Sequence, residues 1–233
     1  MKCYKIIQRT AIAIGFMTFS GAGVAGETIQ EGKLKVGTDL TYPPYDMLVD
    51  GQPAGFDPEF VNELAKPMGL EAEILDTRWA VIIPGLQGNK YDIIASALYI
   101  SKERSEVLDF VPYFQTGNSI IMKKGAGEKY TQPQDLCGVA VGMITATVGG
   151  KILSGAESES CRKNGKENVN LKEFPTDAEA TQALLSGQID AQMTDAAVSK
   201  NVVERLGDKL EVTSTSILYP APVGIGLRKD SGE

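Results

Sequence analysis

Arg104 and Asp195 have the residue types and positions of a charged binding site. Each follows a predicted buried strand: Arg104 lies in the first turn of a helix that Ser101 would cap, and Asp195 begins another helix. An arginine there is unfavourable for the helix dipole, but a guanidinium beside free backbone N–H groups is a good carboxylate receptor. The alternatives are an exposed arginine paired with a neighbouring glutamate, and an aspartate that only caps its helix. The spacing of these residues alone does not distinguish the binding roles from these alternatives.

Two successive β/α units give these two residues equivalent places. The predicted strands are 34–37, 72–75, 92–95, 139–142, 169–174, 189–193 and 223–227, and helices begin at Asp57, Trp79, Thr147, Thr176 or Asp177, and Ala196. This alternation predicts an α/β fold with parallel sheets, whose ligands bind at the carboxyl ends of the strands. Two facing lobes would then present opposite charges to the two ends of a zwitterion.

The joins between the units predict a hinge. The segments near 114–119 and 219–223 look extended, and no low-complexity linker separates the units. We therefore expect the chain to cross twice between a first lobe of residues 26–115 and 219–233 and a second lobe of residues 116–218.

Several other side chains fall at the same predicted edge of the sheets. Those of the first lobe are Asp39, Tyr42, Tyr45, Trp79 and Tyr99. Aromatic faces could stack on a ligand or hold a cation, or they could fill the core. In the second lobe Thr145 and Thr147 lie in the loop after residues 139–142, and Thr147 also has the position of a helix N-cap.

The cysteine and histidine counts limit the chemistry. Cys137 and Cys161 are the cysteines beyond the leader, and such a pair in an exported protein predicts a disulfide. The alternative, a zinc site, has only two sulfurs and no histidine to complete it, so we expect no metal and no cofactor. The lack of histidine also excludes Ser-His-Asp and Cys-His catalysis.

Residues 1–25 have the pattern of a secretory signal peptide. A basic start precedes an apolar stretch at 11–19 that is too short to span a bilayer, and cleavage is expected after Ala25. Removing three basic residues and no acidic ones moves the net charge from −7 to −10. This acidity argues against nucleic acid or an anionic membrane as a partner, and we expect a soluble periplasmic protein.

The chain resembles the periplasmic solute-binding proteins of polar amino-acid ABC importers. The resemblance covers nearly the whole mature chain and is specific in combination; its segments are 37–45, 55–57, 91–94, 100–104, 109–114 and 187–191. It implies a two-lobed Venus flytrap fold, a monomer that closes on an amino acid with a polar or cationic side chain, and delivery to a membrane permease without chemistry.

The resemblance also implies roles for single residues. Arg104 would bind the ligand's carboxylate and Asp195 its ammonium, while Tyr42 and Trp79 would sandwich the side chain. Asp39 would face the side-chain end. Thr145 would complete the carboxylate site from the second lobe, and Ser96 and Ala97 would lend hydroxyl and backbone contacts from the first lobe.

The sequence departs from the family pattern in two places. Tyr99 stands where a small hydroxyl residue is usual, which would reshape the pocket and allow a methylated or cyclic cation such as ectoine. Family members also continue past residue 230, so we expect the first lobe to be incomplete at its C-terminal part.

Two other classes of function remain open. Similar folds host cyclohexadienyl dehydratases, which need a general acid, and Asp39 and Glu173 are the candidates here. Conversion of prephenate or arogenate to product would favour that enzyme. The third class is a ligand-sensing module that acts through a receptor.

Overall fold

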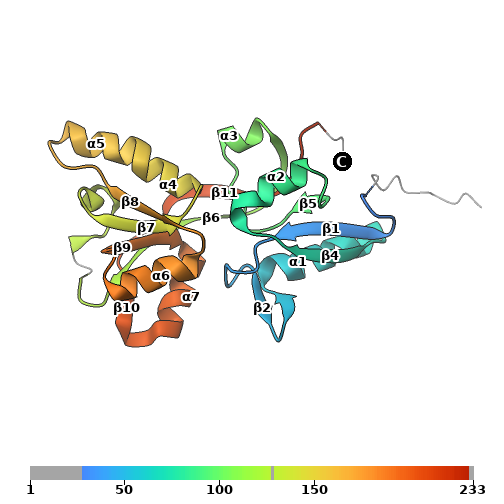
Figure 1. Ribbon diagram of the computed structural model, residues 1–233, viewed down its shortest axis with the longest axis horizontal. Helices are drawn as coiled ribbons and strands as arrows, with labels where there is room; N and C mark the ends of the chain where they lie inside the picture. The colour runs from blue at the N-terminus through green and yellow to red at the C-terminus, as the bar shows by residue number, and fades with distance from the viewer. Residues whose placement is uncertain (1–27, 127–128, 231–233) are drawn as a thin grey trace, which may run out of the picture.

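The computed structural model describes residues 28–126 and 129–230 (Figure 1). The predicted signal peptide at residues 1–25 lies outside these ranges. Within them, no helix has the length and apolar character needed to cross a membrane.

The described chain forms the two lobes that the sequence predicts (Figure 1). One lobe contains β1 (Lys33–Thr38), β2 (Met47–Val49), β3 (Gln52–Ala54), α1 (Phe56–Ala65), β4 (Glu71–Asp76), α2 (Ile82–Gln87), β5 (Ile93–Ile94) and α3 (Lys102–Ser105). The other contains β7 (Ala140–Ile144), α4 (Val148–Ile152), α5 (Ser158–Lys163), β8 (Asn170–Phe174), α6 (Asp177–Ser186), β9 (Ala191–Asp195), α7 (Ala196–Leu206) and β10 (Leu210–Val212).

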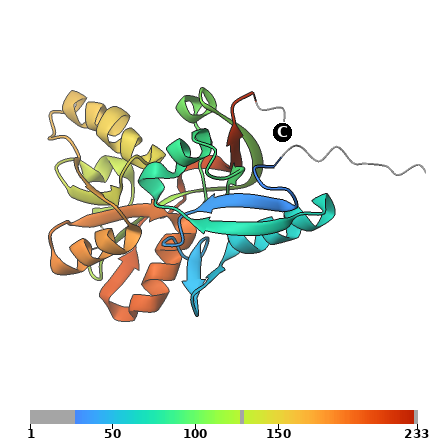
Figure 2. The same cartoon turned by 45° about the vertical axis from the view of Figure 1, so that its right-hand side comes forward.

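Two long strands join the lobes. β6 (Leu108–Lys123) and β11 (Leu218–Arg228) pair antiparallel, and bulges interrupt their register between Leu218 and Ala221 and between Val223 and Gly224. Both strands run between the two halves of the molecule (Figure 2). We infer that the lobe boundaries lie within these strands, because a bulge bends a strand where its ladder is broken.

The sheet order explains how the lobes share a backbone. Along the sheet the order is β4-β1-β5-β11-β6-β9-β7-β8, with β10 also on β6. β1 pairs parallel with β4 and β5, and β7 pairs parallel with β8 and β9. The expected parallel sheets therefore exist on each side, but the antiparallel β6 and β11 join them into one.

Local sequence signals place several helix ends correctly. α7 spans the predicted residues 196–206, and Thr176 caps α6 by accepting a hydrogen bond from the Glu179 N–H at 3.3 Å. The expectation for Asp57 was wrong. α1 begins at Phe56 after Gly55, and the Asp57 carboxylate is buried and bonds residues distant in sequence. Local spacing suggested Asp57 as the cap of this helix, but its carboxylate bonds Ala97 and Tyr113 instead.

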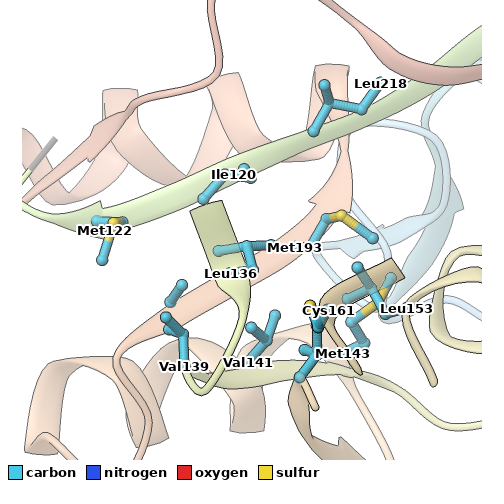
Figure 3. Close-up of a cluster of buried hydrophobic side chains, with 12 residues drawn as sticks. Ile120, Met122, Leu136, Val139, Val141, Met143, Leu153, Cys161, Met193 and Leu218 are labelled. Atoms are coloured by element: carbon cyan, nitrogen blue, oxygen red, sulfur yellow. The ribbon is translucent and has the colours of Figure 1, made fainter. Parts of the chain in front are cut away.

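The second lobe has its own apolar core, drawn in Figure 3. Ile120 and Met193, from the neighbouring strands β6 and β9, pack there with Leu136, Val141 and Leu153. The predicted disulfide between Cys137 and Cys161 is confirmed, and it joins the segment before β7 to α5 beside this core.

Replacing Cys137 and Cys161 together with alanine should lower the free energy of unfolding by about 3 kcal/mol, because the disulfide restrains a loop with a sequence separation of 24. Urea unfolding of both proteins under non-reducing conditions measures the difference. Wild-type protein unfolded with dithiothreitol should show a similar loss, and equal stability of variant and wild type would contradict the prediction.

Candidate ligand-binding site

A cavity lies between the two lobes at the carboxyl ends of their strands. Its first-lobe wall includes these predicted residues: Asp39, Tyr42, Trp79, Ser96, Ala97, Tyr99 and Arg104. Thr147 lines it from the second lobe, with residues that sequence reasoning missed: Asn118, Met143, Ile144, Val148, Gly149, Met193 and Thr194. Its volume is about 50 Å³, well below the ~300–1,000 Å³ of typical small-molecule sites. The lobes are therefore closed tightly on each other.

Arg104 presents a cation that forms no ion pair within the part of the chain that the structure describes. Its guanidinium donates to the Tyr99 carbonyl oxygen at 2.7 Å and, across the cleft, to that of Ala146 at 3.4 Å, and it lies 5.1 Å from the centre of the Trp79 ring. Among the described residues no carboxylate forms an ion pair with Arg104. The neighbouring Glu103 pairs with Lys151 of the second lobe. Burial lowers the pKa of Arg104 to about 10, so it stays protonated at neutral pH.

Asp195 caps its helix, which is one of the two roles that the sequence left open, and its carboxylate also bonds the other lobe. It is the last residue of β9 and caps α7, accepting from the Ala197 N–H at 2.8 Å. The carboxylate is buried and also accepts from two first-lobe phenols, Tyr45 at 2.9 Å and Tyr99 at 2.6 Å. Neither Asp195 nor Tyr45 is among the cavity-lining residues, but Tyr99 connects the carboxylate to the cavity wall.

The phenols around Asp195 stay neutral. Burial raises the pKa values of Tyr42, Tyr45 and Tyr99, and the nearby negative charge of Asp195 is the second cause of the rise. Tyr42 also bridges the lobes, since its hydroxyl lies 3.1 Å from Thr194 Oγ1 and accepts from the Asp195 N–H at 3.3 Å. Three tyrosines of the first lobe therefore form hydrogen bonds to the end of β9 in the second lobe.

The two threonines after β7 behave differently. Thr147 lines the cavity and caps α4, accepting from the Gly150 N–H at 3.2 Å. Thr145 is not among the cavity-lining residues, and its carbonyl oxygen accepts from Trp79 Nε1 at 3.0 Å. Thr145 thus contributes a contact between the lobes through its backbone.

Asp39 is held by donors of its own lobe. Oδ1 accepts from the Thr41 hydroxyl at 2.7 Å and from the Arg78 guanidinium at 3.2 Å, and Oδ2 accepts from the Trp79 N–H at 2.7 Å. Sequence reasoning missed Arg78, although its place between Asp76 and the predicted binding residue Trp79 was a usable signal.

A buried pair of acids supports Ser96 and Ala97 from behind. Ser96 donates to Asp46 at 3.1 Å, and the Ala97 N–H donates to Asp57 at 2.6 Å. Both acids are fully buried, and Asp46 Oδ1 has no hydrogen-bond partner among the described residues. Burial, reinforced by the nearby charge of Asp57, raises the pKa of Asp46 well above its usual value. Burial also raises the pKa of Asp57, to about 6. Asp46 therefore favours its protonated form in the folded protein.

Asp46→Asn should stabilise the protein relative to wild type increasingly as the pH rises. The wild-type native state keeps a proton that the unfolded chain releases, so its stability falls as pH rises above about 4, the unfolded pKa, toward the raised native value. Asparagine is of similar size, can accept from Ser96 as Asp46 does, and does not titrate. The difference should grow by up to about 1.4 kcal/mol per pH unit between about pH 5 and 7.

Urea unfolding at several pH values measures this difference. Asp208→Asn is the matched control, because Asp208 is fully exposed and its replacement should leave the pH dependence unchanged. A pH-independent difference for Asp46→Asn would contradict the raised pKa of Asp46.

The fold and this site define a class. Two α/β lobes joined by two strands and closed over a charged cleft form a solute-binding protein. Residues 34–204 match the bacterial extracellular solute-binding proteins, family 3, and the chain belongs to this family.

Individual relatives agree with this membership. The chain is 30% identical over 214 residues to the L-cystine-binding protein TcyJ of Escherichia coli (strain K12), covering 91% of this chain and 77% of that protein. The arginine-bound truncated ArgBP from T. maritima superposes with a TM-score of 0.74 at 28% identity, over 86% of this chain and 90% of that one. The ancestral amino acid-binding protein AncCDT-1, a precursor of cyclohexadienyl dehydratase, superposes with a TM-score of 0.71 at 33% identity, over 86% of this chain and 84% of that one.

Proposed function

We propose that this protein binds an amino acid, or a closely similar zwitterion, and delivers it to an ABC importer. The observation that carries the proposal is the cation of Arg104, which lines the cleft and forms no ion pair with any carboxylate of residues 28–126 or 129–230. A half-buried guanidinium with unused N–H donors is complementary to a planar carboxylate, which can accept two parallel hydrogen bonds. The ligand's carboxylate would therefore bind Arg104.

Asp195 would bind the ligand's ammonium from the opposite lobe. Its carboxylate receives two phenols and one backbone N–H but no cationic side chain. Burying a carboxylate without a counter-charge is costly, so an ammonium at this position would be stabilising. Together the two residues place opposite charges on the two lobes.

Closure would couple ligand binding to transport. The bonds of Tyr45 and Tyr99 to Asp195, of Trp79 to Thr145 and of Arg104 to Ala146 all join the two lobes. An open form would lack them, and a ligand that touches both lobes would favour the closed form by its differential affinity. The bulged strands β6 and β11 would serve as the hinge.

The relatives support the transport step. TcyJ binds L-cystine and the T. maritima protein binds arginine, and the family is one of extracellular solute-binding proteins. We infer that this chain acts as a monomer in the periplasm after cleavage of its leader, and that its closed form docks on a membrane permease.

Binding without chemistry fits the site better than dehydration does. A dehydratase needs a general acid facing its substrate. Both oxygens of Asp39 already accept hydrogen bonds, and Glu173 is exposed and accepts from the Ala146 N–H at 3.2 Å. Neither carboxyl group is placed as a free proton donor in the cleft.

Arg104→Ala should weaken the binding of amino acids by at least about 30-fold, because truncating one partner of a buried charge pair costs about 2 kcal/mol or more. Isothermal titration calorimetry, on a ligand first found by a thermal-shift screen of amino acids, opines and betaines, measures this loss. Lys102→Ala, an exposed change on the same helix, is the control and should bind normally. Unchanged affinity of Arg104→Ala would refute the carboxylate role.

Asp195→Asn should weaken the binding of ligands that carry an ammonium group. The fold should stay intact, because asparagine is also a good N-cap for α7. Calorimetry with an amino acid and with its deaminated analogue tests the two effects separately. The amino acid should lose affinity and the analogue should not. Equal losses, or none, would show that Asp195 acts through its helix cap and its bonds to Tyr45 and Tyr99 and does not bind the ammonium.

A further inference from the structure

The side-chain end of the site is built around Asp39 and Arg78. The Asp39 carboxylate is 4% exposed and lines the cavity, and the Arg78 guanidinium forms an ion pair with it at 3.2 Å. Arg78 also bonds Asp76 through both of its terminal nitrogens, at 3.3 and 3.1 Å. A second carboxylate therefore anchors the guanidinium where it meets Asp39.

Asp39 has little capacity left to accept a second cation. A carboxylate offers about four lone-pair sites, and three are used by Thr41, Arg78 and the Trp79 N–H. A ligand guanidinium binds a carboxylate best through two parallel hydrogen bonds. It could form both only after displacing Arg78.

The opposite wall of the cavity is uncharged. A side-chain atom added at Gly149 would lie 2.8 Å from Met143 Cε, 3.2 Å from Met193 Cε and 3.3 Å from Asn118 Oδ1, so these three groups converge on the Gly149 backbone. The thioethers of Met143 and Met193 extend from the core of the second lobe (Figure 3). Methionine sulfur and methyl groups pack adaptably against apolar and sulfur-containing groups.

We propose that Arg78 is a specificity-determining residue that neutralises Asp39, so that the site selects an amino acid with an uncharged, apolar or sulfur-containing side chain over a cationic one. The proposal rests on the function proposed above and departs from the polar or cationic side chain that the family resemblance implied. The arginine occupies the carboxylate that a cationic side chain would need, and the methionines supply an apolar surface opposite.

The test compares L-methionine and L-cystine with L-arginine by calorimetry. Wild type should bind at least one of the two uncharged-side-chain probes at least about tenfold more tightly than L-arginine, roughly the effect of one hydrogen bond to a charged group. Arg78→Ala should raise the affinity for L-arginine by at least about tenfold and change the other affinities less than about threefold. The double variant Arg78→Ala/Asp39→Asn should lose this gain.

Two controls keep the outcome interpretable. Arg162→Ala removes another exposed arginine, which bonds Asn168 in the second lobe, and should change no affinity. Arg78→Gln should reproduce the gain without the cavity that alanine leaves. Tighter binding of L-arginine than of both other probes by wild type, or no gain on removing Arg78, would overturn this inference while leaving the proposed function standing. Failure of all three probes to bind, together with no ligand from the screen of amino acids, opines and betaines, would instead overturn both.

Discussion

The buried carboxylate of Asp195 is the constraint on which the closed structure depends. A carboxylate out of water needs hydrogen-bond donors, and two of its three donors are phenols from the other lobe. Those phenols reach it only when the lobes are together. Closure and completion of the site are therefore one event, and Tyr42 and Trp79 add further bonds between the same surfaces.

The other charges of the cleft are distributed unequally. Asp39 is compensated within its own lobe by Arg78, whereas the hydrogen bonds of the Arg104 guanidinium to the described residues go to carbonyl oxygens. Arg104 and Asp195, which form no ion pair within the described chain, lie on opposite lobes, and this is the charge separation on which the proposed zwitterion site rests. Met143, Met193 and Val148 form an apolar part of the cavity wall.

The lining residues are held by a second layer that is itself buried. Asp46 and Asp57 accept from Ser96, Ala97 and Tyr113, and the raised pKa of Asp46 favours a protonated acid over two adjacent buried negative charges. On the other side, the Cys137–Cys161 disulfide restrains the lobe whose core contains Met143 and Met193. Buried acids therefore back the first-lobe wall of the cleft, and a disulfide-linked core backs the second-lobe wall.

The sequence by itself determined the features that depend on near neighbours. The β/α order, the bounds of α7, the caps at Ser101 and Thr176, and the family were readable because periodicity, capping and motifs are local. Only the tertiary structure decided the 16-residue β6 and its antiparallel pairs, the burial of Asp57, the Arg78 ion pair, and the bond from Tyr45 to Asp195 across 150 residues. These depend on which distant segments meet, and one chain's local pattern does not contain that information.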